Sequence, residues 1–306
     1  MLVIKRGYEF FEQNLDLIEN VSWRFTPANF YYSLEYFQAS RDFTIGVFSG
    51  NDLKVILVAT INTRDELDYF AGGSRFYFSK NGNHDIFVKS VKRILDFLLE
   101  CGVKNCIFEY DSVSSFVFHK FYSRTSTSMF LANTLSDNNF SIRKSYRSLI
   151  NKQKRDNTNL IVNRLNLSRE HFDNLRNLHF EASGNRRTRS SHSWELQFDA
   201  IAKNRAFMSL SYNRDGTMTS GALFLTGDRE VFYGVSAQSR ELMLLGEPTG
   251  HIVLKNALAY SQKCGFDRMI LGTTDFSNEK EKSIVFFKKG FSDSMLLINN
   301  MEYELE

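Results

Sequence analysis

The sequence has very little cysteine and proline. Its 306 residues include three cysteines and two prolines. Three unevenly spaced cysteines make no disulfide framework, so we expect a protein of the reducing cytoplasm. No apolar run approaches the roughly 18 residues of a membrane-spanning helix. The apolar start is interrupted at Lys5 and Arg6, which predicts no secretory signal. A net charge of +3 does not by itself indicate a nucleic-acid partner.

Several well-known site motifs are also missing. The sequence contains no Walker loop, no Rossmann glycine fingerprint and no Gly-x-Ser-x-Gly elbow. Its six histidines and three cysteines form no set with metal-ligand spacing, so we expect no metal site. The sequence therefore gives no motif evidence for nucleotide hydrolysis by a P-loop, for dinucleotide redox chemistry or for a serine hydrolase with a nucleophile elbow.

What the sequence does contain is a soluble composition and an internal repeat. Hydrophobic residues make up 42% and charged residues 24%, and the length suits two domains. Residues 101–107, Cys-Gly-Val-Lys-Asn-Cys-Ile, are echoed by 264–270, Cys-Gly-Phe-Asp-Arg-Met-Ile. Further on, residues 115–120 match 283–288 at four of six positions, with Lys120 and Lys288 in register. Two echoes in the same order predict a duplicated domain.

The expected elements follow the same order in both halves: strands, a helix, a strand, a helix and a strand. In the first half, two β-rich runs flank a Ser-Gly-Asn-Asp turn and predict a hairpin over 43–59. In the second half, glycines after helix-like runs mark two helix ends. The expected ranges are helices 85–101, 114–122, 168–178, 251–264 and 283–290, and strands 105–110, 129–132, 206–212, 219–225, 231–237, 269–271 and 295–298.

A basic segment lies between the halves, at residues 141–155. Ile142, Tyr146, Leu149 and Ile150 fall on one helical stripe. The remaining faces carry basic residues, so the helix either is solvated and docks by its stripe, or presents a basic surface that meets phosphates. The basic residues are Arg143, Lys144, Arg147, Lys152, Lys154 and Arg155.

An ordered set of segments in the second half resembles the FemABX-type aminoacyltransferases, which are built from two GNAT-like acyltransferase domains. The set comprises residues 141–155, 186–191, Trp194, 220–224, 233–237 and 287–291. The resemblance covers about residues 40 to 300. It implies an α/β (mixed α+β) fold with tandem GNAT-like domains. We expect a non-catalytic, acceptor-side domain at 1–140, a connecting helix at 141–158, and a donor and catalytic domain at 159–306.

The sequence departs from this pattern in two places. Between Leu160 and Met218 no heptad-patterned helical pair is found, so we expect no coiled-coil arm. Acetyl-CoA enzymes carry a glycine loop whose backbone N–H groups hold the pyrophosphate. Residues 244–251 stand there instead, with other glycine spacing and an unfavourable Glu247. We therefore expect no tightly bound cofactor, and a donor that is either aminoacyl-tRNA or an acyl-CoA.

The resemblance also implies residue roles, each with a plainer alternative. Lys288 would stabilise the oxyanion of the reaction, with Lys289 on the donor side, unless both lysines simply face water at a helix C-terminus. Tyr233 would supply a hydroxyl, unless it is a core residue. Asp275 follows a strand, a common place for functional groups. Lys120 would be a non-catalytic vestige.

The remaining candidates concern substrate binding. Guanidinium groups fit phosphate, so the arginine loop either holds a diphosphate or a tRNA backbone, or is merely solvated. His179 and His251 are candidate bases or ordinary local histidines. The donor or substrate set is Arg186, Arg187, Arg189, Trp194, His251 and Lys289, and the acceptor-phosphate set is Arg143, Lys144 and Arg147.

The function we expect is transfer of an aminoacyl or acyl group from an activated carrier to an amine. The acceptor would belong to an anionic cell-envelope, surface-polysaccharide or nucleotide-sugar precursor, with peripheral membrane contact open. Two alternatives stay open as well: an acyl-CoA N-acyltransferase acting on an amino sugar, and a non-catalytic RNA-binding protein that uses the same scaffold.

Overall fold

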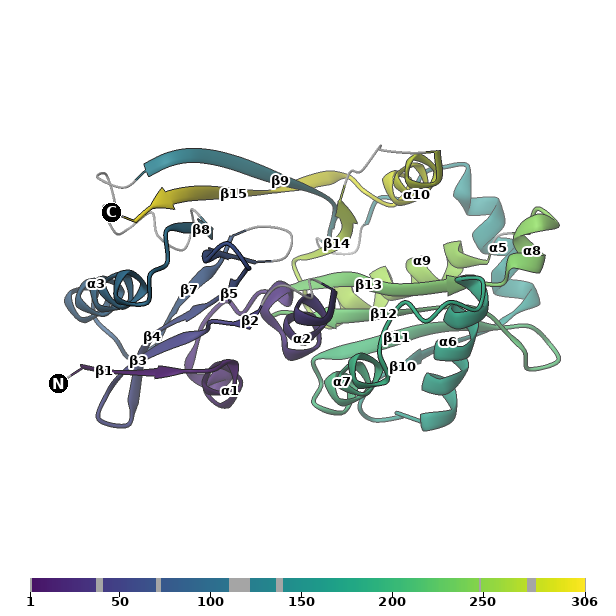
Figure 1. Ribbon diagram of the computed structural model, residues 1–306. Coiled ribbons are helices and arrows are strands. Elements are labelled where there is room, and N and C mark those ends of the chain that lie inside the picture. The colour runs from purple at the N-terminus through teal and green to yellow at the C-terminus, as the bar shows by residue number, and fades with distance from the viewer. Residues whose placement is uncertain are drawn as a thin grey trace. The chain divides into compact units, whose positions relative to one another are not determined.

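The structure is a computed structural model that describes residues 2–36, 41–69, 73–109, 122–135, 140–247, 249–273 and 279–305 (Figure 1). The chain divides into two compact units, residues 1–128 with 297–306 and residues 129–296. The units are bounded differently from the expected domains: the segment 141–158 is part of the second unit, and the last residues of the chain belong to the first.

The first unit contains an antiparallel sheet in the order β1-β3-β4-β7. The expected hairpin is confirmed as β3 and β4, which turn at Gly50 (φ +63°). A second group of strands places β6 parallel to β8. The elements of this unit are β1 (Leu2–Arg6), α1 (Tyr8–Gln13), α2 (Pro27–Tyr36), β2 (Arg41–Asp42), β3 (Ile45–Ser49), β4 (Asp52–Val58), β5 (Thr60–Ile61), β6 (Glu66–Asp68), β7 (Arg75–Phe78), α3 (His84–Glu100) and β8 (Asn105–Glu109).

Helix α3 packs against this sheet in the way its sequence predicts. The Asn83 side chain caps it by accepting a hydrogen bond from the Ile86 backbone N–H at 3.0 Å. Val91, Ile94 and Leu98 recur at helical spacing and lie in the buried core beside the strands. The capping residue and the apolar stripe together fix the start and the buried face of the helix.

A buried ion network lies at the end of β8. Glu109 is paired with both Arg24 and Arg75, and Arg24 is 2% exposed. The guanidinium of Arg24 also lies over the rings of Phe25 and Tyr69, at 5.1 and 5.7 Å from their centroids. The only bridge between the ends of β7 and β8 in the described residues joins Ser74 and Phe108. Charge pairing therefore supplements a very short strand pairing at this place.

The second unit is built on a sheet in the order β10-β11-β12-β13-β14, extended by the end of β9. The first four strands are antiparallel, β13 and β14 are parallel, and β14 pairs antiparallel with β9. The elements that lie wholly in this unit are α5 (Tyr146–Asp156), β10 (Thr158–Val162), α6 (Arg169–Ala182), α7 (Ser191–Ala202), β11 (Ala206–Tyr212), β12 (Met218–Thr226), β13 (Glu230–Gln238), α8 (Arg240–Leu244), α9 (Gly250–Lys263), β14 (Arg268–Thr273) and α10 (Glu279–Lys289). Two strands have residues in both units, β9 (Tyr122–Thr134) and β15 (Ser294–Glu304).

Helices cover both faces of this sheet (Figure 1). Successive strand residues point to opposite faces. A Cβ on Gly221 would meet Leu175 of α6, whereas the next residue, Ala222, packs with Ile252 and Ala257 of α9. Helix α6 therefore lies on one face and α9 on the other. Tyr146 and Ile150 place α5 in the same core as α9, which confirms its apolar stripe.

The three expected strands, the α9 helix and the Lys288 helix are confirmed, and α10 is longer than expected because it begins at Glu279. The expected helix 114–122 lies outside the described residues except for its last residue. The partner expected for one strand was wrong. Residues 129–132 were predicted to close the first half, but Ala132 and Leu131 pair with Ile270 and Gly272 of β14 in the second unit. Strand pairing between segments distant in sequence leaves no local signal that could assign the partner.

Candidate active site

The parallel strands β13 and β14 separate soon after they begin. They pair only from Glu230 to Phe232 along β13. Just beyond, each strand has a bulge in its pairing with its outer neighbour: Gly234 is the extra residue in β13, and Leu271 is the extra residue in β14. The two bulges occur where the strands part, so the backbones diverge at the centre of the sheet.

Lys288 lies at this divergence. Its Nζ is 5.9 Å from the centroid of the Tyr233 ring on β13. On β14, an ideal Cβ on Gly272 would stand 2.5 Å from Nζ and 3.6 Å from Cε of the lysine. Gly272 has φ +113°, a conformation that favours glycine. The structure therefore brings the two described residues of the predicted catalytic set together, and it seats the amine in space that only a glycine leaves open.

Burial favours the neutral forms of both the Lys288 amine and the Tyr233 hydroxyl. Burial lowers the pKa of Lys288, and the negative charge of Glu281 opposes that shift. Burial raises the pKa of Tyr233, and a hydrogen bond with Ser236 opposes it. A desolvated cation interacts more strongly with a developing negative charge than a hydrated one does. Lys289, next along α10, is exposed.

His251 lies in an aromatic group formed by α5, α9 and the end of α10. Its ring is 4.4 Å from that of Tyr146 and 5.0 Å from that of Phe287, both edge-on, and 6.0 Å from that of Phe291. The same Tyr146 ring fills the space over Gly290, where a Cβ would overlap it. This packing holds the start of α5, the start of α9 and the end of α10 together, and it makes His251 a buried member of that group.

The N-terminus of α9 is occupied by two glutamine side chains. Gln238 Oε1 accepts the Gly250 N–H at 3.0 Å, and Gln153 Oε1 accepts the Ile252 N–H at 2.9 Å. The Gln238 amide also lies against Gly250, where a Cβ would overlap it. Helix N-terminal N–H groups are the usual anion-binding groups of such a turn. Here two of them already have protein acceptors.

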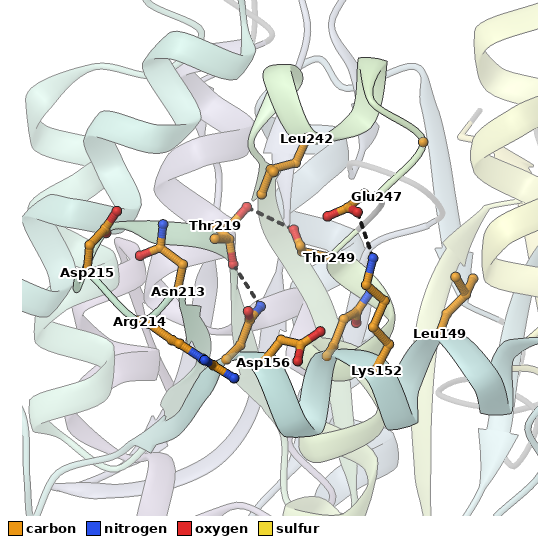
Figure 2. A pocket seen from close by; sticks show the side chains of 13 residues that line it. Leu149, Lys152, Asp156, Asn213, Arg214, Asp215, Thr219, Leu242, Glu247 and Thr249 are labelled. Carbon is orange, nitrogen blue, oxygen red and sulfur yellow. Dashed lines mark hydrogen bonds and ion pairs between the residues drawn. The ribbon is translucent and has the colours of Figure 1, made fainter.

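A cavity of about 460 Å³ adjoins this capped N-terminus (Figure 2). Figure 2 shows α5 along one side, α8 opposite, and a Lys152–Glu247 ion pair of 2.6 Å joining α5 to the segment after α8. Thr249 and Thr219 are hydrogen-bonded within its wall. The lining residues are Leu149, Lys152, Gln153, Asp156, Asn157, Asn213, Arg214, Asp215, Thr219, Leu242, Gly246, Glu247 and Thr249.

A second, smaller cavity of about 210 Å³ gathers the predicted arginine loop. Arg186, Arg187, Arg189 and Trp194 all line it, and so does Arg176 of α6, which is not among the residues predicted from the sequence. Four arginines line this one cavity, and guanidinium groups suit a multiply charged anion.

His179 lines the same cavity, and its ring stacks edge-on against Trp194 at 5.4 Å. Burial lowers the pKa of His179, and the positive charge of Arg189 lowers it further. Burial and the nearby guanidinium thus both favour the neutral imidazole.

The remaining predicted residues are distributed differently. Arg143 is half-buried, with its guanidinium 4.1 Å from the centroid of the Phe286 ring and 5.1 Å from that of Tyr146. It thus joins α5 to α10, whereas Lys144 and Arg147 are exposed. Asp275 and Lys120 lie outside the described residues. Within the described part of the chain, no group of three or more His, Cys, Asp or Glu residues is placed to hold a metal ion.

Solved structures with the same fold are known, although sequence comparison finds no relative. No family model matches the sequence, and no curated protein matches it. Among solved structures, FemX has a TM-score of 0.62 at 13% identity, covering 100% of this chain and 97% of its own. The chain shares its fold with FemX. L-PGS from Bacillus licheniformis has a TM-score of 0.63 at 15% identity, covering 99% of this chain and 93% of its own.

A third likeness is the C-terminal DUF2156 domain of an Agrobacterium fabrum protein, with a TM-score of 0.66 at 13% identity, covering 96% of this chain and 91% of that one. The expected mixed α/β fold is confirmed. Residues 158–218 form β10, α6, α7 and β11, with no coiled-coil arm between them. In the described residues, no helix combines the length and the apolar character that crossing a bilayer requires.

The sequence does not indicate two groups of candidate site residues. The large cavity draws on the turn 213–215 and on Thr219 and Thr249, which carry no recognisable motif. The glutamine caps of α9 come from residues 99 and 12 positions away in sequence. Arg176 could have been found, since it stands on the helix that leads into the arginine loop.

Proposed function

We propose that the second unit transfers an aminoacyl or acyl group from an activated carrier to an amine. The observation that carries this proposal is the position of Lys288, whose amine lies against Gly272 and Tyr233 where β13 and β14 diverge. In the proposed reaction the amine nitrogen of the acceptor attacks the donor carbonyl carbon. The C–N bond forms, the carbonyl–carrier bond breaks, and the proton lost by the amine is returned to the leaving group.

Lys288 acts on the charge that develops in this step. Attack places a negative charge on the carbonyl oxygen, and an ammonium group already held beside it stabilises that charge without reorganisation. The Tyr233 hydroxyl stays protonated because burial raises its pKa, so it can donate but not attack. We propose that Lys288 stabilises the oxyanion and that the Tyr233 hydroxyl donates a hydrogen bond to the reacting groups.

The capped start of α9 favours an ester donor on a tRNA over a CoA thioester. A pyrophosphate at this place would have to displace the Gln153 or Gln238 side chain from the N–H groups of Ile252 and Gly250. An unmade buried hydrogen bond costs about 1–3 kcal/mol. The acyl-CoA alternative therefore has an obstacle in the structure that an aminoacyl ester does not meet.

The arginine cavity supports an acceptor that carries phosphate. It lies beside α6 and α7, the helices that pack on the face of the sheet opposite to α9. A donor held on the α9 face and an acceptor held on the α6–α7 face would meet at the strand divergence. We propose a phosphate-bearing envelope or nucleotide-sugar precursor as the class of acceptor.

The test is a donor screen with the full chain. A charged tRNA pool, acetyl-CoA and longer acyl-CoAs are each incubated with a nucleotide-linked acceptor that has a free amine, and the acceptor is analysed by mass spectrometry. We expect the acceptor to gain one aminoacyl group with the tRNA pool only. Lys288→Met should abolish the gain, and the exposed neighbour in Lys289→Met serves as the matched control. Transfer that survives Lys288→Met, or that runs on acetyl-CoA alone, contradicts the proposal.

The same experiment separates the RNA-binding alternative, which the basic α5 helix motivates. That alternative expects tRNA binding with a steep dependence on salt and no transfer from any donor. Acyl transfer that depends on Lys288 excludes a purely non-catalytic scaffold.

A further inference from the structure

Three successive apolar residues stand exposed at the rim of the large cavity. Met243, Leu244 and Leu245 are 53%, 89% and 69% exposed. The preceding residue, Leu242, instead lines the cavity (Figure 2). We call residues 243–245 the apolar tip. Exposed apolar side chains are common singly, whereas three in a row at a cavity rim indicate a surface that another body covers.

The conformation of the tip is held by the backbone rather than by apolar packing. Ser239 caps α8 by accepting the Leu242 N–H, and the N–H groups of Leu245 and Gly246 bond to the carbonyls of Glu241 and Met243. The Arg240 guanidinium also donates to the Ala182 carbonyl at 2.7 Å. The apolar side chains are therefore presented outward by a segment whose own hydrogen bonds are satisfied.

The first unit supplies an internal comparison, because β7, α3 and β8 also run strand, helix, strand, and Ser74, just before β7, forms a parallel bridge with Phe108 of β8. In the first unit, the connection between the strand and the main helix that correspond to β13 and α9 runs from Ser79 to Asn83 and reads Ser-Lys-Asn-Gly-Asn. This connection has no large apolar residue, and it links a strand to the following helix without an apolar tip. The fold does not require the apolar residues of the second unit, so their presence needs another cause.

Helix α5, on the opposite side of the cavity, carries an excess of basic residues outside the lining, whereas the lining itself has two basic and three acidic residues. Between residues 141 and 156 the chain has six basic residues and one acidic residue, and Lys144, Arg147, Lys154 and Arg155 are exposed. The Lys152–Glu247 pair joins α5 to the segment that follows the tip, so the two rims belong to one cavity. An apolar insertion element beside a cluster of lysine and arginine is the combination that binds an anionic bilayer surface reversibly.

We propose that the apolar tip and the exposed cations of α5 dock the second unit on an anionic lipid bilayer, with the tip among the acyl chains and the cations on the headgroups. This inference goes beyond the proposed acyl transfer and does not depend on it. It identifies the partner as the surface of a membrane, with the mouth of the large cavity turned toward that surface.

The test is co-sedimentation of the full chain with vesicles. We expect binding to phosphatidylcholine vesicles that contain roughly a quarter phosphatidylglycerol, and little binding to phosphatidylcholine alone. Leu244→Ser combined with Leu245→Ser should reduce the bound fraction about ten-fold or more. Leu165→Ser is the matched control, because Leu165 is 93% exposed in the same unit but lies away from the cavity lining. All of these positions are exposed, so folding should be unchanged by circular dichroism.

Two further arms decide between this partner and others. Lys154→Gln combined with Arg155→Gln should remove the preference for phosphatidylglycerol, and added salt should weaken binding. The proposal is overturned if the serine variants bind vesicles as the wild type does. It is also overturned if the tip instead drives self-association, seen as a wild-type dimer that Leu244→Ser with Leu245→Ser converts to a monomer. Binding of tRNA that competes with vesicles and ignores the tip would assign the basic surface to RNA.

Discussion

The side-chain amine of Lys288 occupies the space that a Cβ would take on Gly272. The two residues come from different elements, α10 and β14, and the glycine stands at φ +113° where β14 leaves β13. Any side chain at this position would displace the amine from the strand divergence. The glycine is thus as much a requirement of the proposed site as the lysine is.

Gly272→Ala should therefore abolish acyl transfer while the chain still folds. The added Cβ would stand 2.5 Å from the lysine Nζ, and the backbone conformation adds about 1–3 kcal/mol of strain. Gly265→Ala is the control: Gly265 also has a positive φ, +82°, but a Cβ there meets nothing within 4 Å. We expect both variants to lose similar stability in urea titrations and only Gly272→Ala to lose turnover. Equal turnover in the two would separate Gly272 from the site.

The pH dependence of turnover should report the Lys288 pKa. The proposed role needs the ammonium form, and burial lowers its pKa, so the rate should fall with rising pH at values below those expected of an exposed lysine. Glu281→Gln should move this alkaline limb to still lower pH, because the Glu281 charge raises the Lys288 pKa. Rates are measured across pH with the acceptor saturating. A limb that stays in place in Glu281→Gln would show that another group titrates.

The lowered pKa of Lys288 also predicts that replacing this lysine stabilises the fold, although the replacement abolishes activity. The folded pKa of Lys288 lies below its unfolded value, so the unfolded state holds more protons between the two values and stability rises with pH there. Lys288→Met should accordingly be more stable than the wild type at neutral pH. The difference should shrink as pH rises through the lowered pKa toward the ordinary value. Urea titrations of both proteins at several pH values measure it, and a constant difference would contradict the assignment of the shift to Lys288.

Gln153 should contribute more to stability than its charged neighbour. Gln153→Ala leaves the Ile252 N–H at the start of α9 without this acceptor in a buried place, which should cost about 1–3 kcal/mol. Lys152→Ala removes an ion pair to Glu247 whose side chains are 48% and 50% exposed. Such pairs contribute about 0–1 kcal/mol. Urea unfolding of the two variants gives the ranking, and a larger loss in Lys152→Ala would show that the amide cap is not important.

How much of this could be read from the sequence differs between its parts. The apolar stripe of α5, the extents of α3 and α9 and the turns between strands depend on local chemistry, and the sequence predicts them. The position of Lys288 came from its resemblance to a family and from its register in the repeat. Its contact with Gly272 could not be predicted, because it depends on where α10 crosses β14 and on a bulge in the strand.

The glutamine caps show the same limit. Nothing in the composition around Gln153 or Gln238 distinguishes a capping amide from a surface one, since the partner N–H groups lie in a helix that is distant in sequence. Residues 129–132 were assigned to the first half for the same reason, whereas they pair with β14 in the second unit. Long-range pairing chooses among strands of equal propensity by their final packing.

Glu109→Gln in the first unit should be strongly destabilising. The carboxylate is 4% exposed and pairs with both Arg24 and Arg75, so neutralising it leaves buried positive charge without this compensation. Breaking a buried pair from one side costs about 3–5 kcal/mol. Arg93→Gln is the matched control, because its pair with Glu100 in the same unit is exposed on both sides and should cost less than about 1 kcal/mol. Urea denaturation followed by far-UV circular dichroism compares the two, and a loss in Glu109→Gln no larger than that in Arg93→Gln would mean that the network is not needed for stability.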